Sequence, residues 1–177
     1  MGVGTTIPNR LKGLLYMDSG DGRGTSGRVF WLCNTAASGG SDGNSGTGPD
    51  QPVATVNYAI GLCTASRGDV IRVMEGHSET ISTATGFEAD VAGIRIIGMG
   101  SGALRPTFNF TATGAILAVT AANIEISNCI FVCNVASHTR FITLAGGADG
   151  FNIHDCELRE GSASGIFNQK SNFDITN

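Results

Sequence analysis

The 177-residue sequence predicts an all-β protein: a right-handed, single-stranded parallel β-helix of roughly five turns, with an N-terminal capping helix and an extended N-terminal arm. The first indication is a six-residue pattern that recurs four times along the second half of the chain. The second is an alternation of apolar and polar residues, rich in β-branched types, from residue 70 onward. The third is composition. The chain has 26 Gly and only 15% charged residues, which is typical of proteins rich in strands and tight turns.

Residues 1–28 differ from the rest of the chain and predict an arm. A short apolar patch precedes the Gly-rich run DSGDGRGTSG at 18–27, and such a segment stays loosely ordered unless a partner holds it. We therefore expect the arm to dock on another protein. The side chains expected to make that contact are Leu11, Leu14, Leu15 and Tyr16.

Residues 29–177 are predicted to form one β-helix domain that begins with a strand and a cap. The segment VFWLC at 29–33 has the composition of a strand, and the turn-forming segment 38–52 is an exposed loop. A helix is predicted over 54–66, where apolar residues at helical spacing form one stripe. This helix is well placed to cover the N-terminal end of the solenoid, which otherwise exposes unpaired backbone. The stripe consists of Val56, Ala59, Ile60 and Cys63.

The recurring pattern begins at residues 93, 123, 150 and 172 and ends each time in Gly, Asn or Asp. Its two apolar positions lie two residues apart, so in a strand they point to one side and fill the interior. The final residue takes the bend into the next sheet, because Gly, Asn and Asp tolerate left-handed backbone. The predicted interior column is Ile96, Ile126, Ile153 and Ile175. The predicted corners are Gly98, Asn128, Asp155 and Asn177.

Further alignments follow from stacking the copies. The segments AILAV at 115–119 and FITLA at 141–145 are predicted to be matching strands of neighbouring turns. Cys129 and Cys156 directly follow corner residues and are expected to stack on each other. The fourth copy ends at Asn177 with no cap behind it. We therefore expect either that a partner subunit covers this end or that the natural chain is longer.

Charge and cysteine content narrow the function classes. The net charge of −4 offers no attraction to nucleic acid or to an anionic membrane. The five cysteines are odd in number and include no CxxC, so we expect reduced thiols rather than a disulfide framework or a zinc site. Asp42, Asn44 and Asp50 resemble a calcium loop only superficially, because the later Glu is missing. No metal or cofactor is predicted.

Candidate catalytic groups are interpreted as surface features. The predicted outward column is Arg95, Glu125, Asn152 and Asp174. Arg95 and Glu125 would lie one turn apart and form an exposed ion pair, worth about 0–1 kcal/mol. A catalytic pair is the weaker interpretation, because no clustered carboxylates accompany it in the sequence.

The remaining polar and aromatic candidates receive similar interpretations. Glu157 and Glu160 are predicted to form a solvated corner rather than the carboxylate pair of a glycosidase. His154 is predicted to have a surface or turn-capping role. Phe30 and Trp31 lie in a continuous apolar strand, so core or subunit contacts are favoured over a sugar site. No catalytic residue is predicted.

The order of these segments resembles the start of pectate-lyase-like β-helix proteins. In those families a segment D-x-N-x-G-T … P-x-x-T-x-x-x-A precedes a GD-x-I strand and a later I-x-I-x-G turn. The resemblance covers roughly residues 29–177 and implies the fold more than any activity, since this fold hosts lyases, hydrolases, adhesins and phage structural proteins. The matching residues are Asp42, Asn44, Gly46, Thr47, Pro52, Thr55, Ala59, Gly68, Asp69 and Ile71.

The resemblance, the arm and the few charges together lead to a functional expectation. We expect a non-enzymatic structural protein of a bacteriophage virion, made in the bacterial cytoplasm: a capsid decoration (cement) protein or the base segment of a tail spike or fibre. Such a protein would act as a homo-oligomer, with a trimer favoured, docked on other capsid or tail proteins. The alternatives are a polysaccharide lyase or depolymerase and a carbohydrate-binding adhesin, in which case the ligand is a glycan.

Overall fold

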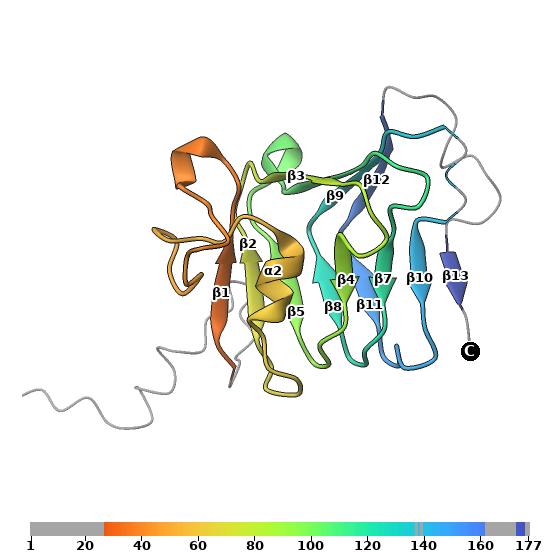
Figure 1. The fold of residues 1–177 in the computed structure, drawn as a ribbon, viewed down its shortest axis with the longest axis horizontal. Coiled ribbons are helices and arrows are strands. Elements are labelled where there is room, and N and C mark those ends of the chain that lie inside the picture. Colours follow the sequence, from red (N-terminus) through yellow and green to blue (C-terminus); the bar gives the residue numbers. More distant parts are fainter. Residues whose placement is uncertain (1–26, 137, 139, 162–172, 176–177) are drawn as a thin grey trace, which may run out of the picture.

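The computed structural model describes residues 27–136, 138, 140–161 and 173–175, and in them the chain winds into three parallel sheets (Figure 1). Sheet A holds β1 (Val29–Leu32), β2 (Val70–Val73), β5 (Arg95–Gly98), β8 (Glu125–Ser127) and β11 (Asn152–His154). Sheet B holds β3 (Ser78–Ile81), β6 (Thr107–Phe110), β9 (Ile130–Cys133) and β12 (Glu157–Glu160). Sheet C holds β4 (Phe87–Ala89), β7 (Leu117–Val119), β10 (Ile142–Leu144) and β13 (Phe173–Ile175).

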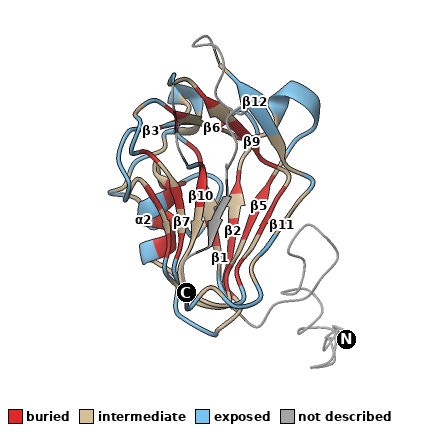
Figure 2. Ribbon diagram, turned by 90° about the vertical axis from the view of Figure 1, so that its right-hand side faces the viewer, coloured by how far each residue is buried: buried red, intermediate tan, exposed pale blue. Residues whose placement is uncertain are grey.

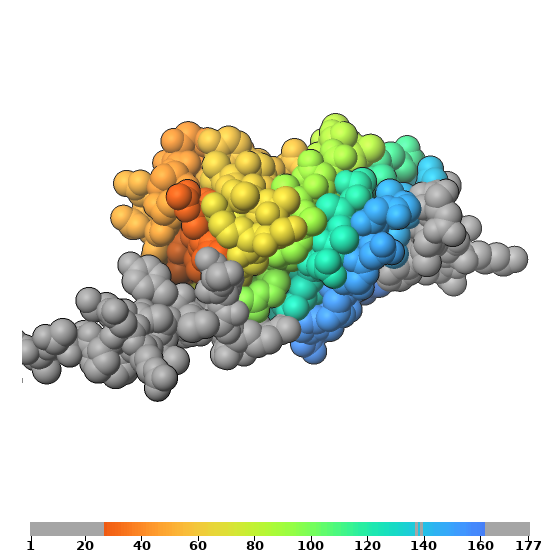
Figure 3. Space-filling model, turned by 90° about the horizontal axis from the view of Figure 1, so that it is seen from below, coloured from red at the N-terminus to blue at the C-terminus, as the bar shows by residue number. Residues whose placement is uncertain are grey.

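From β2 onward each turn of the chain adds one strand to every sheet, and neighbouring strands of each sheet pair in parallel. The prediction of an all-β parallel β-helix is therefore confirmed, as is the pairing of 115–119 with 141–145, which appears as β7 and β10. The turns follow one another along the long axis, as the colours of Figure 3 show.

The predicted number of turns is wrong, because the structure has about three complete turns rather than five. These are β2–β3–β4, β5–β6–β7 and β8–β9–β10. The in-register partners Val70, Arg95, Glu125 and Asn152 are 25, 30 and 27 positions apart. A turn thus uses more chain than the shortest repeats found in solenoid proteins, and fewer turns fit after residue 70.

The fourth copy of the sequence pattern lies in a different sheet from the other three. Phe173–Ile175 is β13, which pairs with β10 in sheet C, so Asp174 is opposite Thr143 and Ile175 is opposite Leu144. Ile175 therefore does not belong to the Ile96 column, nor Asp174 to the Arg95 column. The reason is spacing: Phe173 follows Asn152 by 21 positions, less than one full turn.

The interior is filled by stacked apolar side chains, and the buried residues lie mainly along the strands (Figure 2). Ile96 and Ile126 are fully buried, stand opposite each other in register and continue to Ile153, which is partly buried at the last turn of sheet A. Under sheets B and C the core is an aromatic cluster. Its rings lie about 5–6.5 Å apart, a spacing that favours tilted and edge-to-face contacts. The cluster consists of Phe87, Phe108, Phe110, Phe131 and Phe141.

The corner residues use two different backbone solutions. Asn128 and Asp155 both have a left-handed backbone, with φ of 56° and 55°. Gly98 does not; it ends β5, and a Cβ there would lie 2.1 Å from the carbonyl oxygen of Asn128 in the next turn. Gly98 is thus required by close packing of backbones rather than by the left-handed conformation predicted for it.

The capping helix is shorter than predicted. Helix α2 spans Val56–Gly61 and packs against β4, the first strand of sheet C, and against β1. Thr55 caps its N-terminus by accepting a hydrogen bond from the Tyr58 N–H. The helix ends before residue 66 because the Thr64 N–H is bound by the buried Asp69 carboxylate, at 2.7 Å, which holds the chain in a bend.

Several predictions lie outside the described residues: the arm over most of 1–28, the docking residues Leu11, Leu14, Leu15 and Tyr16, and the corner at Asn177.

Two short 3-10 helices, η1 (Ala36–Ser38) and η2 (Gly102–Leu104), lie in connections between strands. In the described part of the chain no helix has both the length and the apolar character to cross a membrane.

Candidate functional site

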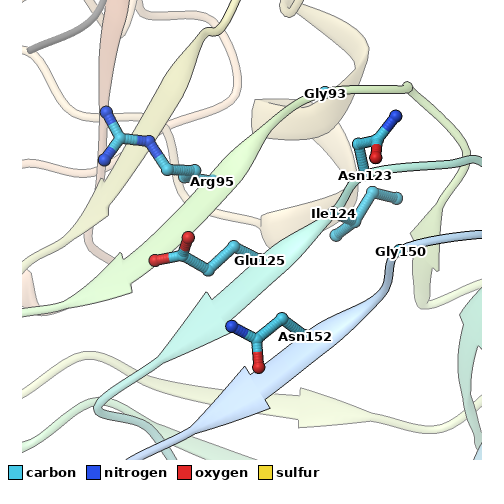
Figure 4. Close-up of a pocket in the computed structure, with 7 residues that line it drawn as sticks. All are labelled: Gly93, Arg95, Asn123, Ile124, Glu125, Gly150 and Asn152. Carbon is cyan, nitrogen blue, oxygen red and sulfur yellow. The ribbon is translucent and has the colours of Figure 1, made fainter.

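The main candidate site is a polar depression on the outer face of sheet A (Figure 4). Arg95 of β5, Glu125 of β8 and Asn152 of β11 stand side by side in register, so their side chains form one row across three turns. The depression has a volume of about 380 Å³ and is completed by the bends that precede these strands. Asp174, the fourth residue predicted for this row, belongs to sheet C.

The bends that complete the depression share a left-handed backbone. Gly93, Asn123 and Gly150 have φ of 75°, 56° and 70°, and each stands two residues before its strand. The Gly93 N–H donates to the Ala122 carbonyl and the Asn123 N–H to the Asp149 carbonyl, which joins the three bends edge to edge. A Cβ at Gly150 would lie 2.7 Å from Asn123 Oδ1, so a larger residue there would displace the neighbouring amide. In the sequence these three copies begin with Gly or Asn, residue types that tolerate a left-handed backbone.

His154 links the polar row to the next corner. Its Nε2 lies 3.3 Å from Glu125 Oε1 and its Nδ1 lies 2.8 Å from Asp155 Oδ2. The hydrogen bond to Asp155, and then the contact with Glu125, raise the pKa of His154 above its usual 6.5. His154 therefore lies at the surface, as predicted, and contacts two carboxylates there. Its ring gains positive charge at mildly acidic pH.

Trp31 lies on the same outer face, at the N-terminal end of sheet A. It is opposite Arg72 in register, and the guanidinium carbon of Arg72 lies 5.2 Å from the ring centroid, a cation–π contact. Its neighbour Phe30 is buried in the core, as alternation along a strand requires. Trp31 is thus half-buried on the outside, not in the core.

A second polar cluster surrounds Glu157 where the chain bends from sheet A into sheet B. The Glu157 carboxylate accepts hydrogen bonds from Arg105 and from Arg159, and Arg105 also donates to the Asp155 carbonyl. The hydrogen bond from Arg159, followed by the contact with Arg105, lowers the pKa of Glu157. Glu160, predicted as its companion, is exposed on the same strand.

Two acidic residues of the resembled motif act as structural anchors. Asp42 Oδ1 accepts the N–H groups of Ala54 and Thr55, and its Oδ2 accepts the Thr55 hydroxyl, so the carboxylate fixes the start of α2. Asp69, fully buried, accepts N–H bonds from Arg28 and Thr64 and two from the Arg67 guanidinium, all within 2.7 Å. Both carboxylates thus tie segments distant in sequence to one bend.

Sequence reasoning missed a buried pair, His77 and Glu79. Glu79 Oε2 accepts the Val56 N–H of α2 at 2.9 Å and lies 3.2 Å from His77 Nε2. The His77 ring lies 5.4 Å from the ring of Phe108, so the pair sits directly against the aromatic cluster. The one available signal was alternation: Glu79 occupies an inward position in a strand whose other inward residue is Ile81.

Comparison with known proteins adds no relative: no family model, curated protein or solved structure matches the chain. The β-helix assignment thus rests on the strand pairing itself, and the pectate-lyase-like resemblance stays a prediction. Within the described ranges, no group of three or more His, Cys, Asp or Glu side chains is arranged to hold a metal ion.

Proposed function

We propose that the chain is a non-enzymatic structural protein of a bacteriophage virion, acting as an oligomer, either as a capsid decoration protein or as the base segment of a spike or fibre. One observation carries the proposal: the carboxylates of Asp42, Asp69 and Glu157 hold the fold together through hydrogen bonds to neighbouring segments. Both oxygens of Asp42 and of Asp69 accept hydrogen bonds, and Glu157 lies between two guanidinium groups.

Anchored carboxylates are suited to structure rather than to polysaccharide cleavage. A glycosidase or lyase needs groups that exchange a proton with the substrate during each cycle. A carboxylate that accepts hydrogen bonds at both oxygens is occupied by its donors and fixes the segments that donate to it. The parallel ladders run through successive turns along the long axis (Figure 3), and such an extended form suits a module on a particle surface or in a fibre.

The proposal is tested with the full chain. Light scattering is expected to give a mass three times the chain mass of 18.2 kDa, and mass spectrometry is expected to detect the chain in purified phage particles from the encoding bacterium. Incubation with uronate polymers and capsular polysaccharides, with and without calcium, is expected to release no unsaturated products and no new reducing ends. Robust cleavage, or a monomer absent from particles, would overturn the proposal.

Glycan binding is a second candidate, favoured by the depression on sheet A. Arg95, Glu125 and Asn152 offer guanidinium, carboxylate and amide groups in one row, a set that suits the hydroxyl and carboxyl groups of an acidic saccharide. Trp31, on the same face, provides an aromatic ring of the kind on which sugar rings pack.

A glycan array with the full chain tests this candidate. Binding is expected to fall at least tenfold in E125Q and N152A, and to be unchanged in E88Q, a matched Glu-to-Gln change on β4 of sheet C. Equal binding by all three variants would mean that the glycan does not bind in the depression on sheet A, and the depression would then no longer support this candidate function.

A further inference from the structure

Two cysteines stack on each other at the bend between sheets A and B. Cys129 follows the corner Asn128 and Cys156 follows the corner Asp155, and the next residues, Ile130 and Glu157, are in-register partners. The Cys129 Sγ lies 3.3 Å from the Ser127 carbonyl oxygen and the Cys156 Sγ lies 3.9 Å from the Ile126 carbonyl oxygen, so both thiols reach the end of β8. The two thiols are close enough for each to affect the pKa of the other.

This stacking meets the Cα-distance requirement of a disulfide. Neighbouring parallel strands lie about 4.8 Å apart, and the Cα atoms of bonded cysteines are usually about 4.4–6.8 Å apart. Because the register places Cys129 and Cys156 at the same level of adjacent turns, a bond between them needs little movement of the backbone.

The two thiols differ in access and in acidity. Cys129 is fully buried, whereas Cys156 belongs to the last turn and is partly exposed. The hydrogen bond from Cys129, assisted by a backbone N–H and by the positive charges of His154 and Arg105, lowers the pKa of Cys156 to about 7. The same hydrogen bond and burial raise the pKa of Cys129 well above the ordinary value of 9.0. The accessible sulfur is therefore the more nucleophilic one at neutral pH.

We propose that Cys156 and Cys129 form a thiol–disulfide exchange site that takes small-molecule disulfides as oxidants. The Cys156 thiolate attacks one sulfur of the small disulfide, which forms a mixed disulfide and releases one thiolate. Cys129 then loses its proton to solvent, and its sulfur attacks the Cys156 sulfur and releases the second thiolate. The protein loses two electrons and two protons, and the small disulfide becomes two thiols.

The product is a covalent staple between the last two turns. It joins the bend before β12 to the bend before β9, and it closes a loop of the chain that contains the whole of β9, β10 and β11. Among the described residues β11 and β12 are the outermost strands of sheets A and B, and an outermost strand pair is otherwise held only by its own ladder and packing. Oxidation is therefore expected to protect this end of the solenoid against local opening. The inference is independent of the proposed virion function.

The other three cysteines serve as internal controls. Burial, followed by the charge of Asp69, raises the pKa of Cys63 to about 12, and burial also raises the pKa of Cys133. Cys33 is buried, with its sulfur 3.4 Å from the Thr35 hydroxyl. The pKa of Cys156 is lowered whereas those of Cys63 and Cys133 are raised, so Cys156 has the larger thiolate fraction of these three at neutral pH.

The test begins with the reduced full chain and oxidised glutathione. Free thiols are expected to fall from five to three, the intact mass to fall by two hydrogens, and peptide mapping to show one crosslink, 129–156. In C129A the reaction is expected to stop at a glutathione adduct on Cys156, whereas C156S is expected to form no adduct at residue 129. The matched variant C63S is expected to form the crosslink as the unmodified chain does.

A measurement on the unmodified chain keeps the proposal falsifiable if the variants fold poorly. Alkylation by iodoacetamide, followed residue by residue with mass spectrometry, is expected to be at least tenfold faster at Cys156 than at Cys63 near pH 7. Because Cys129, His154 and Arg105 face Cys156 and together lower its pKa to about 7, its rate is expected to decline as pH falls through that value. Equal rates at both cysteines, or oxidation to a crosslink other than 129–156, would overturn the proposal.

Discussion

Replacement of Phe131 by alanine tests the register on which the whole fold depends. Phe131 lies in β9, in register with Phe108 of β6, and its side chain is fully buried. Val132, the next residue, is only partly buried because it points to the opposite side of sheet B. The comparison of F131A with V132A therefore measures the difference between the inner and outer faces of one strand.

The magnitude follows from what the ring contacts. Phe131 lies within 5.3–6.5 Å, centroid to centroid, of four other rings of the aromatic cluster. Truncation of a buried Phe to Ala costs about 3–5 kcal/mol, and the lost ring pairs place this site toward the upper end. A domain of this kind has a free energy of unfolding of about 5–15 kcal/mol. V132A is expected to cost less than about 1 kcal/mol.

Urea unfolding followed by far-ultraviolet circular dichroism measures both changes. With an m-value of about 2 kcal/mol per molar urea, F131A is expected to lower the midpoint by about 2 M and V132A by less than about 0.5 M. A V132A midpoint well below that of F131A would mean that the strand is shifted by one residue, because such a shift reverses the inner and outer faces of sheet B. That result would refute the reasoning.

Three further predictions concern the anchors and the corners. D69N is expected to cost about 2–4 kcal/mol in urea unfolding, because the buried group that accepts four N–H bonds loses its charge and one of its two acceptor oxygens. Burial raises the pKa of Asp69, but the hydrogen bonds from Arg67, Thr64 and Arg28 lower it overall. The stabilisation by the ionised carboxylate is therefore present above the ordinary pKa of 3.8 and is lost as pH falls through the lower pKa of the folded state. D69N is expected to lack this pH-dependent loss of stability. NMR titration is expected to give His154 a pKa above 6.5 that falls toward 6.5 in D155N. The stabilisation by the charged His154 ring is expected to be complete below about 6.5 and to be lost as pH rises through the pKa of His154 in the folded state. G98A is expected to unfold at markedly lower urea than G114A, since a Cβ at Gly98 meets backbone at 2.1 Å and one at Gly114 meets nothing within 4 Å.

The strands and their bends were readable from sequence because both obey local rules. A strand with one face buried must alternate, and a bend into left-handed backbone selects Gly, Asn or Asp. Asn128 and Asp155 carry that backbone, and Gly93 and Gly150 carry it at the start of their copies. These signals lie within one short copy of the pattern, so no knowledge of the rest of the chain is needed to find them.

The structural roles of the buried acidic residues Glu79 and Asp69 could not be predicted, because their hydrogen-bond partners are distant in sequence. Glu79 accepts a hydrogen bond from the Val56 N–H, 23 positions away, and Asp69 accepts one from the Arg28 N–H, 41 positions away. The sequence shows Glu79 as an acidic residue in a predicted strand and Asp69 as an acidic residue in a predicted turn. Neither the depth of burial nor the number of donors follows from the residue type, since both depend on which turns come to lie beside each other.

The misplaced fourth copy shows which information the local pattern lacks. An apolar–polar–Ile segment followed by Asn describes any strand that fills the interior and then bends, whichever sheet it joins. The sheet is decided by the length of chain since the previous strand. Within sheet A, in-register partners such as Arg95, Glu125 and Asn152 are separated by one full turn of chain. The stretch from the start of β11 to the start of β13 is shorter than any of those turns, whereas the stretch from β10 to β13 is long enough for one.

The chain that follows β11 therefore passes sheet B, where it forms β12, and reaches sheet C before a full turn is complete. The spacing of in-register partners places Ile175 in line with Val119 and Leu144. An assignment that combines the local pattern with turn length would have put it there, because the pattern identifies a strand and the length of a turn identifies the sheet that the strand joins.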